Sequence, residues 1–267
     1  MLTLLTASSK VSAKNLRIYN SCVAFASALA PLTGEYIYNK FYNIIYDIWI
    51  IGALISLIAS IILVKMLNNN EDVVQEKLIL KYDNPLKNGQ HIGNFAILLI
   101  SSISYGAIVT YLPIYFNEIK FSIGLYSLIF WASYVIAQFI NKYIYRTLSE
   151  NTMIALLLIC LCIGELIISL APFKFMYLLS ALIYGISYGL MYNFFYTKAS
   201  FIKDDQSKNN VYAVIGLMSY IGVGLAPTFL SPFLKMEIRM IFAFSTIYIV
   251  TALFIHFLLH LKNNKYV

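Results

Sequence analysis

Glu165 lies within a long run of apolar residues, and Glu35 lies directly after another, near the outer end of the first expected helix. A carboxyl group inside a membrane-spanning helix is costly, so it usually binds an ion or a proton or pairs with a polar neighbour. Both residues are therefore candidates for coupling a proton or cation to another event. The alternatives are an interfacial carboxylate for Glu35 and a structural carboxyl, protonated or paired, for Glu165. His256 and His260 lie one turn apart near the end of the last run, where we expect them at a membrane boundary rather than in a coupling site.

Four tyrosines follow one another at four-residue steps: Tyr184, Tyr188, Tyr192 and Tyr196. A helix turns once in 3.6 residues, so this series drifts by about 40° per step and we expect at most the first three to share a face. Their hydroxyl groups need polar partners when they are buried. A ridge of small residues runs beside them, formed by Ala181, Gly185 and Gly189, and it predicts close packing of a second helix.

The polar and aromatic residues of these runs predict the lining of an internal cavity. Trp131 and Tyr134 lie within a run rather than at its ends, and Gln138 follows Tyr134 by one turn. We predict that six residues line the cavity: Tyr105, Tyr134, Gln138, Tyr184, Tyr188 and Asn193. The alternative is that the tyrosines only fill contacts with lipid or between helices.

The elements that carry these residues are eight apolar runs, which fill most of the 267 residues. They span residues 18–34, 48–64, 92–117, 121–141, 151–173, 175–197, 209–234 and 240–255. A transmembrane helix needs about 20 mostly apolar residues, and in lipid a helix satisfies its own backbone polar groups. The composition agrees, with 60% hydrophobic and 12% charged residues. The sequence therefore predicts an all-α membrane protein with eight transmembrane helices in a lipid bilayer.

The formal net charge of +7 does not indicate a nucleic-acid partner, because the basic residues follow the loops. If the N-terminus is cytoplasmic, fourteen of the 19 Lys and Arg residues fall in cytoplasmic segments. Loops rich in Lys and Arg are retained in the cytoplasm, so this distribution agrees with a cytoplasmic N-terminus. We therefore predict a multi-pass protein of the cell membrane with both termini cytoplasmic.

The sequence holds no phosphate-binding loop, catalytic triad or cluster of metal-ligating residues. We accordingly predict neither an enzyme nor a cofactor or metal site. Cys22, Cys160 and Cys162 fall inside apolar runs, where we expect them to pack as small apolar residues.

The longest polar segment, residues 65–90, separates two apolar runs from six. We predict four regions on this basis. They are a two-helix unit at 1–66, a cytoplasmic linker at 67–91, a six-helix unit at 92–262 and a cytoplasmic tail at 263–267.

An internal repeat relates the first apolar run to the seventh. An Ala-x3-Ala-Pro sequence ends at Pro31 and a Gly-x3-Ala-Pro sequence ends at Pro227, and one more run follows each. Proline frees the carbonyl four residues earlier, and small residues let a neighbouring helix approach closely. We predict kinked, closely packed helices at Ala30-Pro31 and Ala226-Pro227, suited to two units that rock against each other. The alternative is a pair of ordinary prolines tolerated in membrane helices.

The first copy of this repeat, together with Gly34, resembles the antiporter motif of drug exporters in the major facilitator superfamily, Gly-x3-Gly-Pro-x2-Gly-Gly. Alanines replace two of its glycines and Glu35 replaces the last. The stretch 105–115, with Pro113, is similar to helix seven of that family. Residues 137–146 resemble its inner-loop motif Gly-x3-Asp-Arg-x-Gly-Arg-Arg, with Asn-Lys and a final arginine kept. The order of helices and loops matches over essentially the whole chain.

The resemblance implies a gradient-driven efflux permease of antiporter type for a small molecule. The stretch 93–143 is similar to exporters of metal-chelators of the staphylopine type, and a multidrug exporter is the other branch implied. The family has twelve helices, and the eight runs correspond to helices five to twelve. The comparison therefore also implies an N-terminally truncated chain that is inactive alone. A non-transporting membrane scaffold or assembly partner is the alternative class.

The predicted topology can be tested with reporter fusions. Reporters fused after Gln90 and after Val267 should both signal a cytoplasmic location, because the basic segments are retained there. A fusion after Lys174, in a short loop with few basic residues, should signal the opposite side. An extracytoplasmic signal from either of the first two fusions would overturn the topology.

Overall fold

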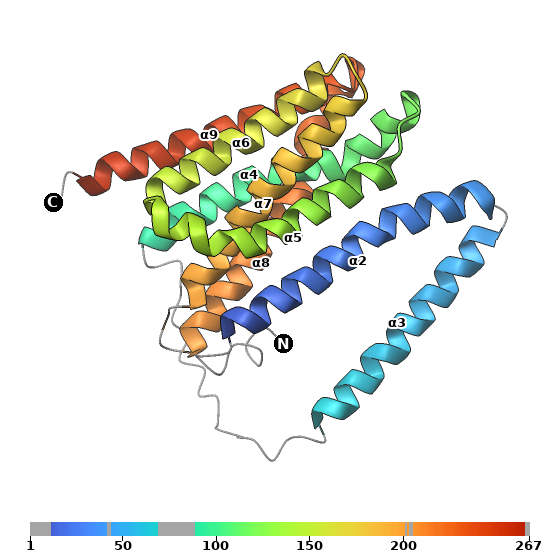
Figure 1. Ribbon diagram of the computed structural model, residues 1–267, viewed down its shortest axis with the longest axis horizontal. Helices are drawn as coiled ribbons and strands as arrows, with labels where there is room; N and C mark the ends of the chain where they lie inside the picture. Colours follow the sequence, from blue (N-terminus) through green and yellow to red (C-terminus); the bar gives the residue numbers. More distant parts are fainter. Residues whose placement is uncertain (1–11, 42–43, 69–88, 201, 203–204, 265–267) are drawn as a thin grey trace. The chain divides into compact units, whose positions relative to one another are not determined.

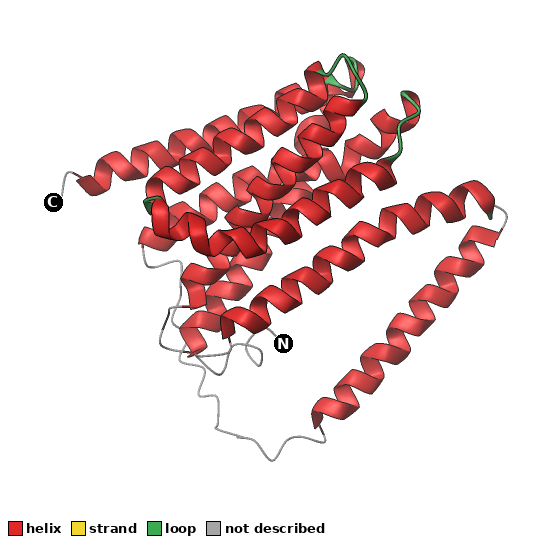
Figure 2. Cartoon of the chain, viewed as in Figure 1, coloured by secondary structure: helices red, strands yellow, loops and turns green. Residues whose placement is uncertain are grey.

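A computed structural model describes residues 12–41, 44–68, 89–200, 202 and 205–264. These residues form helices and short connections, with no strand among them (Figure 2). In chain order the elements are α2 (Ser12–Lys40), α3 (Ile45–Asn68), α4 (Gly89–Glu118), α5 (Ile123–Thr147), α6 (Glu150–Leu170), α7 (Phe175–Ser200), α8 (Asp205–Leu230), the 3-10 helix η3 (Ser231–Lys235) and α9 (Met240–Asn264) (Figure 1). Most of the predicted linker and the last residues of the predicted tail lie outside the described residues.

Six of the described helices are long and apolar enough to cross a membrane. These spans are Ile92–Glu118, Ile123–Asn141, Glu150–Leu170, Phe175–Ser200, Asn210–Lys235 and Met240–Leu261. They confirm an all-helical membrane protein but not the full count of eight spans. The chain is helical at the two remaining runs as well. However, α2 carries the polar residues Asn20 and Ser27 within its run and Glu35 directly after it, and the described apolar part of α3, Tyr46–Ile62, is short.

Contacts divide the chain into two compact units, Met1–Leu32 with Asp83–Val267, and Thr33–Tyr82. The second unit holds α3 and the last turns of α2. In the first unit, α4 packs against α8 and α9, α5 packs against α7, and α6 packs against α7 and α9 (Figure 1). Side chains of α4 and α7 meet in the interior, where the rings of Tyr105 and Tyr188 stack. The domain boundaries expected from the sequence stay a prediction.

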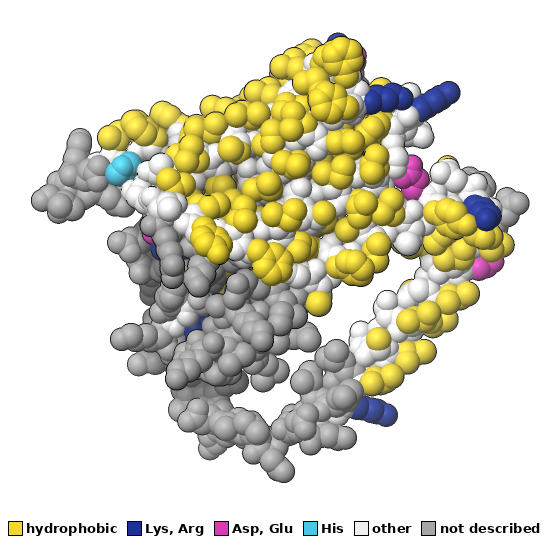
Figure 3. Space-filling model, in the orientation of Figure 1, with side chains coloured by type: hydrophobic (Ala, Val, Ile, Leu, Met, Phe, Trp, Pro, Cys, Tyr) yellow, Lys and Arg dark blue, Asp and Glu magenta, His cyan; other side chains and the backbone are white. Residues whose placement is uncertain are grey.

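The outward-facing side chains of the spanning helices are apolar. Phe139, Leu170, Val250 and Phe254 are all more than half exposed. Figure 3 shows hydrophobic side chains over most of the visible surface of α5, α6 and α9, with charged side chains near the helix ends. A surface of this kind is stable when lipid replaces water around it.

Helices α4 and α8 approach each other through glycine. A Cβ atom added to Gly106 would lie 2.5 Å from the Cβ atom of Ala226 and 2.7 Å from the carbonyl oxygen of Val223. A Cβ atom added to Gly222 would lie 2.4 Å from the carbonyl oxygen of Leu99. The Val223 carbonyl is the group that Pro227 leaves without its helical N–H partner. The freed carbonyl thus lies against a glycine of the neighbouring helix.

The repeat behaves differently in α2. Its Ala26 and Ala30 are exposed, whereas Ala24 and Ala28 are buried. Two residues correspond to about 200° of helix rotation, so α2 buries nearly the opposite face from the one that the repeat indicates.

Helices α5 and α7 also meet through glycine. A Cβ atom added to Gly185 would lie 2.4 Å from the carbonyl oxygen of Phe130, and one added to Gly189 would lie 2.9 Å from the Cβ atom of Ala137. Ala181 is fully buried on the same ridge. The close helix packing predicted from this small-residue ridge is confirmed, and its partner is α5.

The glycine contacts predict a position-specific cost for one added methyl group. Gly222→Ala should lower the free energy of unfolding by about 1–3 kcal/mol, because the backbone of α4 must move to admit the new Cβ atom. Gly224→Ala is the matched control, since a Cβ atom there meets no atom within 4 Å. Denaturant or thermal unfolding of the purified proteins measures both. Equal stabilities for the two variants would contradict the close α4–α8 contact.

Candidate functional site

The Glu165 carboxyl group is fully buried where four helices converge. Ser104 Oγ of α4 donates a hydrogen bond to Glu165 Oε2 at 2.6 Å, and Ser245 Oγ of α9 donates to Glu165 Oε1. Tyr184 Oη of α7 lies 2.9 Å from Ser104 Oγ. The carboxyl group of α6 is thus held by neutral hydroxyl groups from α4 and α9, with a tyrosine behind one of them.

The number of hydroxyl hydrogens in this network allows Glu165 to be either ionised or protonated. Each hydroxyl group has one hydrogen to donate, and Ser245 Oγ lies near both Glu165 Oε1 and, at 2.9 Å, the carbonyl oxygen of Phe242. When Ser245 donates to Glu165, the carboxyl group is satisfied as an acceptor at both oxygens. When Ser245 turns to Phe242, a proton on Glu165 can be donated to Ser245 in return. A single hydroxyl rotation therefore accommodates gain or loss of a proton.

An aromatic pocket lies beside this network. It has a volume of about 430 Å³ and is lined from α4 and α5, with further residues of α2 within the same compact unit. Its aromatic lining residues are Tyr105, Tyr126, Phe130 and Trp131. The Tyr105 ring stacks on Tyr188 of α7, with ring centroids 4.4 Å apart. The pocket wall is therefore mostly apolar and aromatic, with few polar atoms.

Three consecutive residues of α4 serve three different partners. Ser104 bonds to Glu165, Tyr105 lines the pocket, and Gly106 contacts α8. Successive residues of a helix point about 100° apart, so one turn of α4 connects the carboxyl network, the pocket and the α8 contact.

The structure separates the residues predicted to line the cavity. Tyr105 lines the pocket, and Tyr184 belongs to the Glu165 network. Tyr188 is buried behind Tyr105, and its ring also approaches Tyr134 at 6.3 Å. Tyr134 and Tyr188 lie where α5 packs against α7, and the lining of one cavity by all these side chains stays a prediction.

Gln138 and Asn193 lie further along the same interface. Gln138 Nε2 donates to the carbonyl oxygen of Gly189 at 3.4 Å, and Asn193 Oδ1 accepts from Thr197 at 3.0 Å. Both residues are buried and are bonded to α7.

Tyrosines of α7 form a continuous series of ring contacts. Ring contacts run from Tyr184 to Tyr188, to Tyr192 and on to Tyr196, which in turn contacts Tyr212 of α8 at 5.6 Å. These contacts join tyrosines one turn apart and do not place all four side chains on one face, so the expected limit of three on a shared face stays a prediction.

The remaining predicted residues lie elsewhere. Glu35 belongs to the second compact unit, whereas Glu165 lies in the first. Pro31 and Pro113 line the pocket together with Ala30, and Pro227 lies inside α8. The Pro227 carbonyl oxygen accepts a hydrogen bond from Tyr111 Oη at 3.2 Å.

A comparison with protein families identifies the chain. Residues 3–227 match the model of the Major Facilitator Superfamily. The chain belongs to the major facilitator superfamily. No curated protein matches it.

Membership of the major facilitator superfamily makes this protein a transporter of that type. It is a multi-pass membrane protein, and its partners are the lipid bilayer and a small-molecule substrate. The family suggests transport rather than catalysis, in agreement with the sequence analysis.

Sequence reasoning missed the partners of Glu165 and part of the pocket. Ser104, Ser245 and Tyr126 were not among the predicted site residues. A lone glutamate in an apolar helix requires polar partners, which draws attention to hydroxyl groups in other spans. The sequence holds many such serines, and only the packing of α4, α6 and α9 selects two of them.

Ser104 should contribute more to stability than a neighbouring buried serine of the same helix. Ser104→Ala should lower the free energy of unfolding by about 1–2 kcal/mol, because Glu165 and Tyr184 both lose a partner. Ser101→Ala is the control, since Ser101 bonds to the carbonyl oxygen of Leu98 in its own helix. Unfolding in denaturing detergent measures the difference. A loss at Ser101 as large as that at Ser104 would contradict the network.

Proposed function

We propose that this transporter is a gradient-driven efflux permease in which Glu165 is the proton-coupling residue. The observation that carries the proposal is the burial of this carboxyl group among hydroxyl groups of three other helices. An ionisable residue inside a membrane marks an ion or proton pathway by default. Glu35 is the second coupling candidate.

The network links proton binding to helix packing. A proton on Glu165 reverses the hydrogen bond to Ser245 and leaves the bond from Ser104 in place. Proton binding therefore changes the hydrogen bond between α6 and α9, while the hydrogen bond between α6 and α4 is kept. Transporters of this kind alternate access by moving packed helices around a fixed site, and a contact whose hydrogen bond reverses with the proton can bias that movement.

The pocket supports an apolar, aromatic substrate. Tyr105, Phe130 and Trp131 offer ring faces, and the walls hold few polar atoms. Small-molecule sites take their affinity from such apolar surfaces and their orientation from a few polar groups. A drug-like compound fits this lining better than a strongly polar metal-chelator. The export direction rests on the resemblance of the Pro31 region to the antiporter motif.

The complete membrane arrangement is part of the same proposal. α2 and α3 would be the first two of eight spans, with both termini in the cytoplasm of a cell-membrane protein. The eight helices would correspond to helices five to twelve of the family, with 92–262 as its C-terminal six-helix unit. The bias of basic residues and the order of the helices support this arrangement.

The proton site can be tested without measuring net flux. Infrared difference spectra of the purified chain across a pH titration should show a buried carboxylic-acid band that Glu165→Gln removes. Glu150→Gln is the matched control on the same helix, because Glu150 is exposed and pairs with Lys198. A titrating band that persists in Glu165→Gln would assign the proton to another group.

Transport by the same proteins is measured in vesicles with an imposed pH gradient and a fluorescent aromatic dye. If the chain moves the dye despite the truncation that the family resemblance implies, the gradient-driven part of that movement should be lost in Glu165→Gln and kept in Glu150→Gln. Equal gradient dependence in both variants would contradict the coupling role.

A further inference from the structure

A second hollow lies between the start of α6 and the end of α9, away from the aromatic pocket. It has a volume of about 670 Å³. Its lining residues are Ser149, Asn151, Thr152, Ala155, Val250, Leu253, Phe254, His256, Phe257 and His260. The function proposed above uses none of them. We call this hollow the α6–α9 groove.

The groove is divided along its length into a polar and an apolar part. Its polar residues come from the first turn of α6 and the last turns of α9, at the ends of the spans Glu150–Leu170 and Met240–Leu261. Its apolar residues, including Ala155, Val250 and Phe254, lie further into the spans. Val250, Phe254 and Phe257 are more than half exposed, so in a bilayer this part opens onto lipid.

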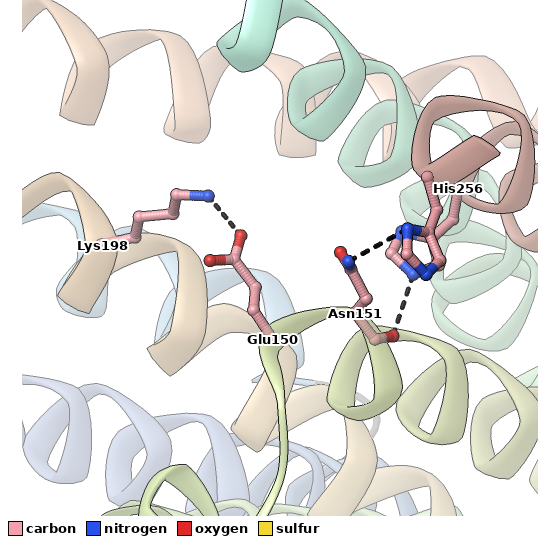
Figure 4. A network of polar contacts seen from close by, with 5 residues as sticks. Glu150, Asn151, Lys198 and His256 are labelled. Carbon is pink, nitrogen blue, oxygen red and sulfur yellow. Dashed lines mark hydrogen bonds and ion pairs between the residues drawn. The ribbon is translucent and has the colours of Figure 1, made fainter. Parts of the chain in front are cut away.

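Asn151 organises the polar part, as Figure 4 shows. Its backbone carbonyl accepts a hydrogen bond from His256 Nε2 at 2.9 Å, and its side-chain amide lies 3.3 Å from His260 Nδ1. An amide nitrogen only donates, so His260 Nδ1 accepts and a neutral His260 ring carries its proton on Nε2. The imidazole of His260 therefore presents an N–H donor at the edge of the bilayer.

The start of α6 adds further donors. Ser149 Oγ caps the helix by accepting from the N–H of Thr152 at 3.3 Å. The N–H groups of Glu150 and Asn151, in the same first turn, have no partner within the helix. A helix N-terminus carries partial positive charge and favours anions. The negative charge of Glu150 is offset by its ion pair with Lys198 of α7 (Figure 4).

We propose that the α6–α9 groove binds a phospholipid with an anionic headgroup. The phosphate would accept hydrogen bonds from His260 Nε2 and from the first turn of α6. One acyl chain would lie along Val250, Phe254 and Phe257. Two features favour this occupant over a water-soluble anion. The donors sit where a headgroup lies, and the apolar part of the groove continues from them toward the middle of the membrane.

The charge bias of the sequence is consistent with this occupant. It predicts that this end of the spans faces the cytoplasm, the leaflet that presents anionic lipids to basic and donor-rich sites between helices. The proposal does not depend on the coupling role of Glu165. A negative result for lipid binding therefore does not contradict proton coupling at Glu165, and the reverse also holds.

Native mass spectrometry of the purified 267-residue chain tests the proposal. The protein is mixed with equal amounts of phosphatidylglycerol and phosphatidylcholine, and the retained lipid is identified. We expect retained phosphatidylglycerol to exceed phosphatidylcholine. The double variant Asn151→Ala with His260→Ala should reduce this retention about fivefold.

Two further variants keep the result interpretable. His260→Lys retains a donor and adds a positive charge, so it should keep or raise phosphatidylglycerol retention. Phe139→Ala removes an exposed phenylalanine of α5 outside the groove and should leave it unchanged. Equal retention of the two lipids, or unchanged retention in the double variant, would overturn the proposal. Retention of inorganic phosphate in place of lipid in the same mass spectra would also overturn the proposal.

Discussion

The close approach of helix backbones at glycine is the contact on which the described six-helix arrangement depends. Lipid is as apolar as the helices themselves, so burial of apolar surface does not hold them together, and packing must do so. Gly106 and Gly222 bring α4 and α8 into contact, and Gly185 and Gly189 do the same for α5 and α7. At Gly106 the approach has a second effect, because it covers the carbonyl group that Pro227 frees in α8.

Helix α4 connects the two sites on which the proposed transport mechanism depends. One of its turns bonds to the buried glutamate, lines the aromatic pocket and contacts α8 through Ser104, Tyr105 and Gly106. A movement of this turn would therefore displace the pocket wall and the hydrogen-bond donor of Glu165 together. Such a short physical connection suits the proposed mechanism, in which binding of the substrate and of a proton influence each other.

The Glu165 network and the α6–α9 groove use the same two helices at different depths. Ser245 and Glu165 join α9 to α6 near one end of the spans, and His256 with Asn151 joins them near the other. Hydrogen bonds in the interior of a membrane protein fix which faces of two helices meet. A lipid bound at the second junction, as proposed, would stabilise the same helix pair that Glu165 and Ser245 connect.

The sequence alone determined the class of the protein and the positions of its helices. Long apolar runs in lipid must form helices, because a helix satisfies its own backbone polar groups. A single glutamate within such a run is a candidate functional residue, because a carboxyl group is costly in the membrane. The small-residue ridge of α7 also predicted a close neighbour, since only small side chains permit one. The sequence did not determine which faces meet. Ser104 and Ser245 were selected from many serines, and Ala24 and Ala28 were buried in place of Ala26 and Ala30, because those choices depend on the rotation of each helix against its neighbours.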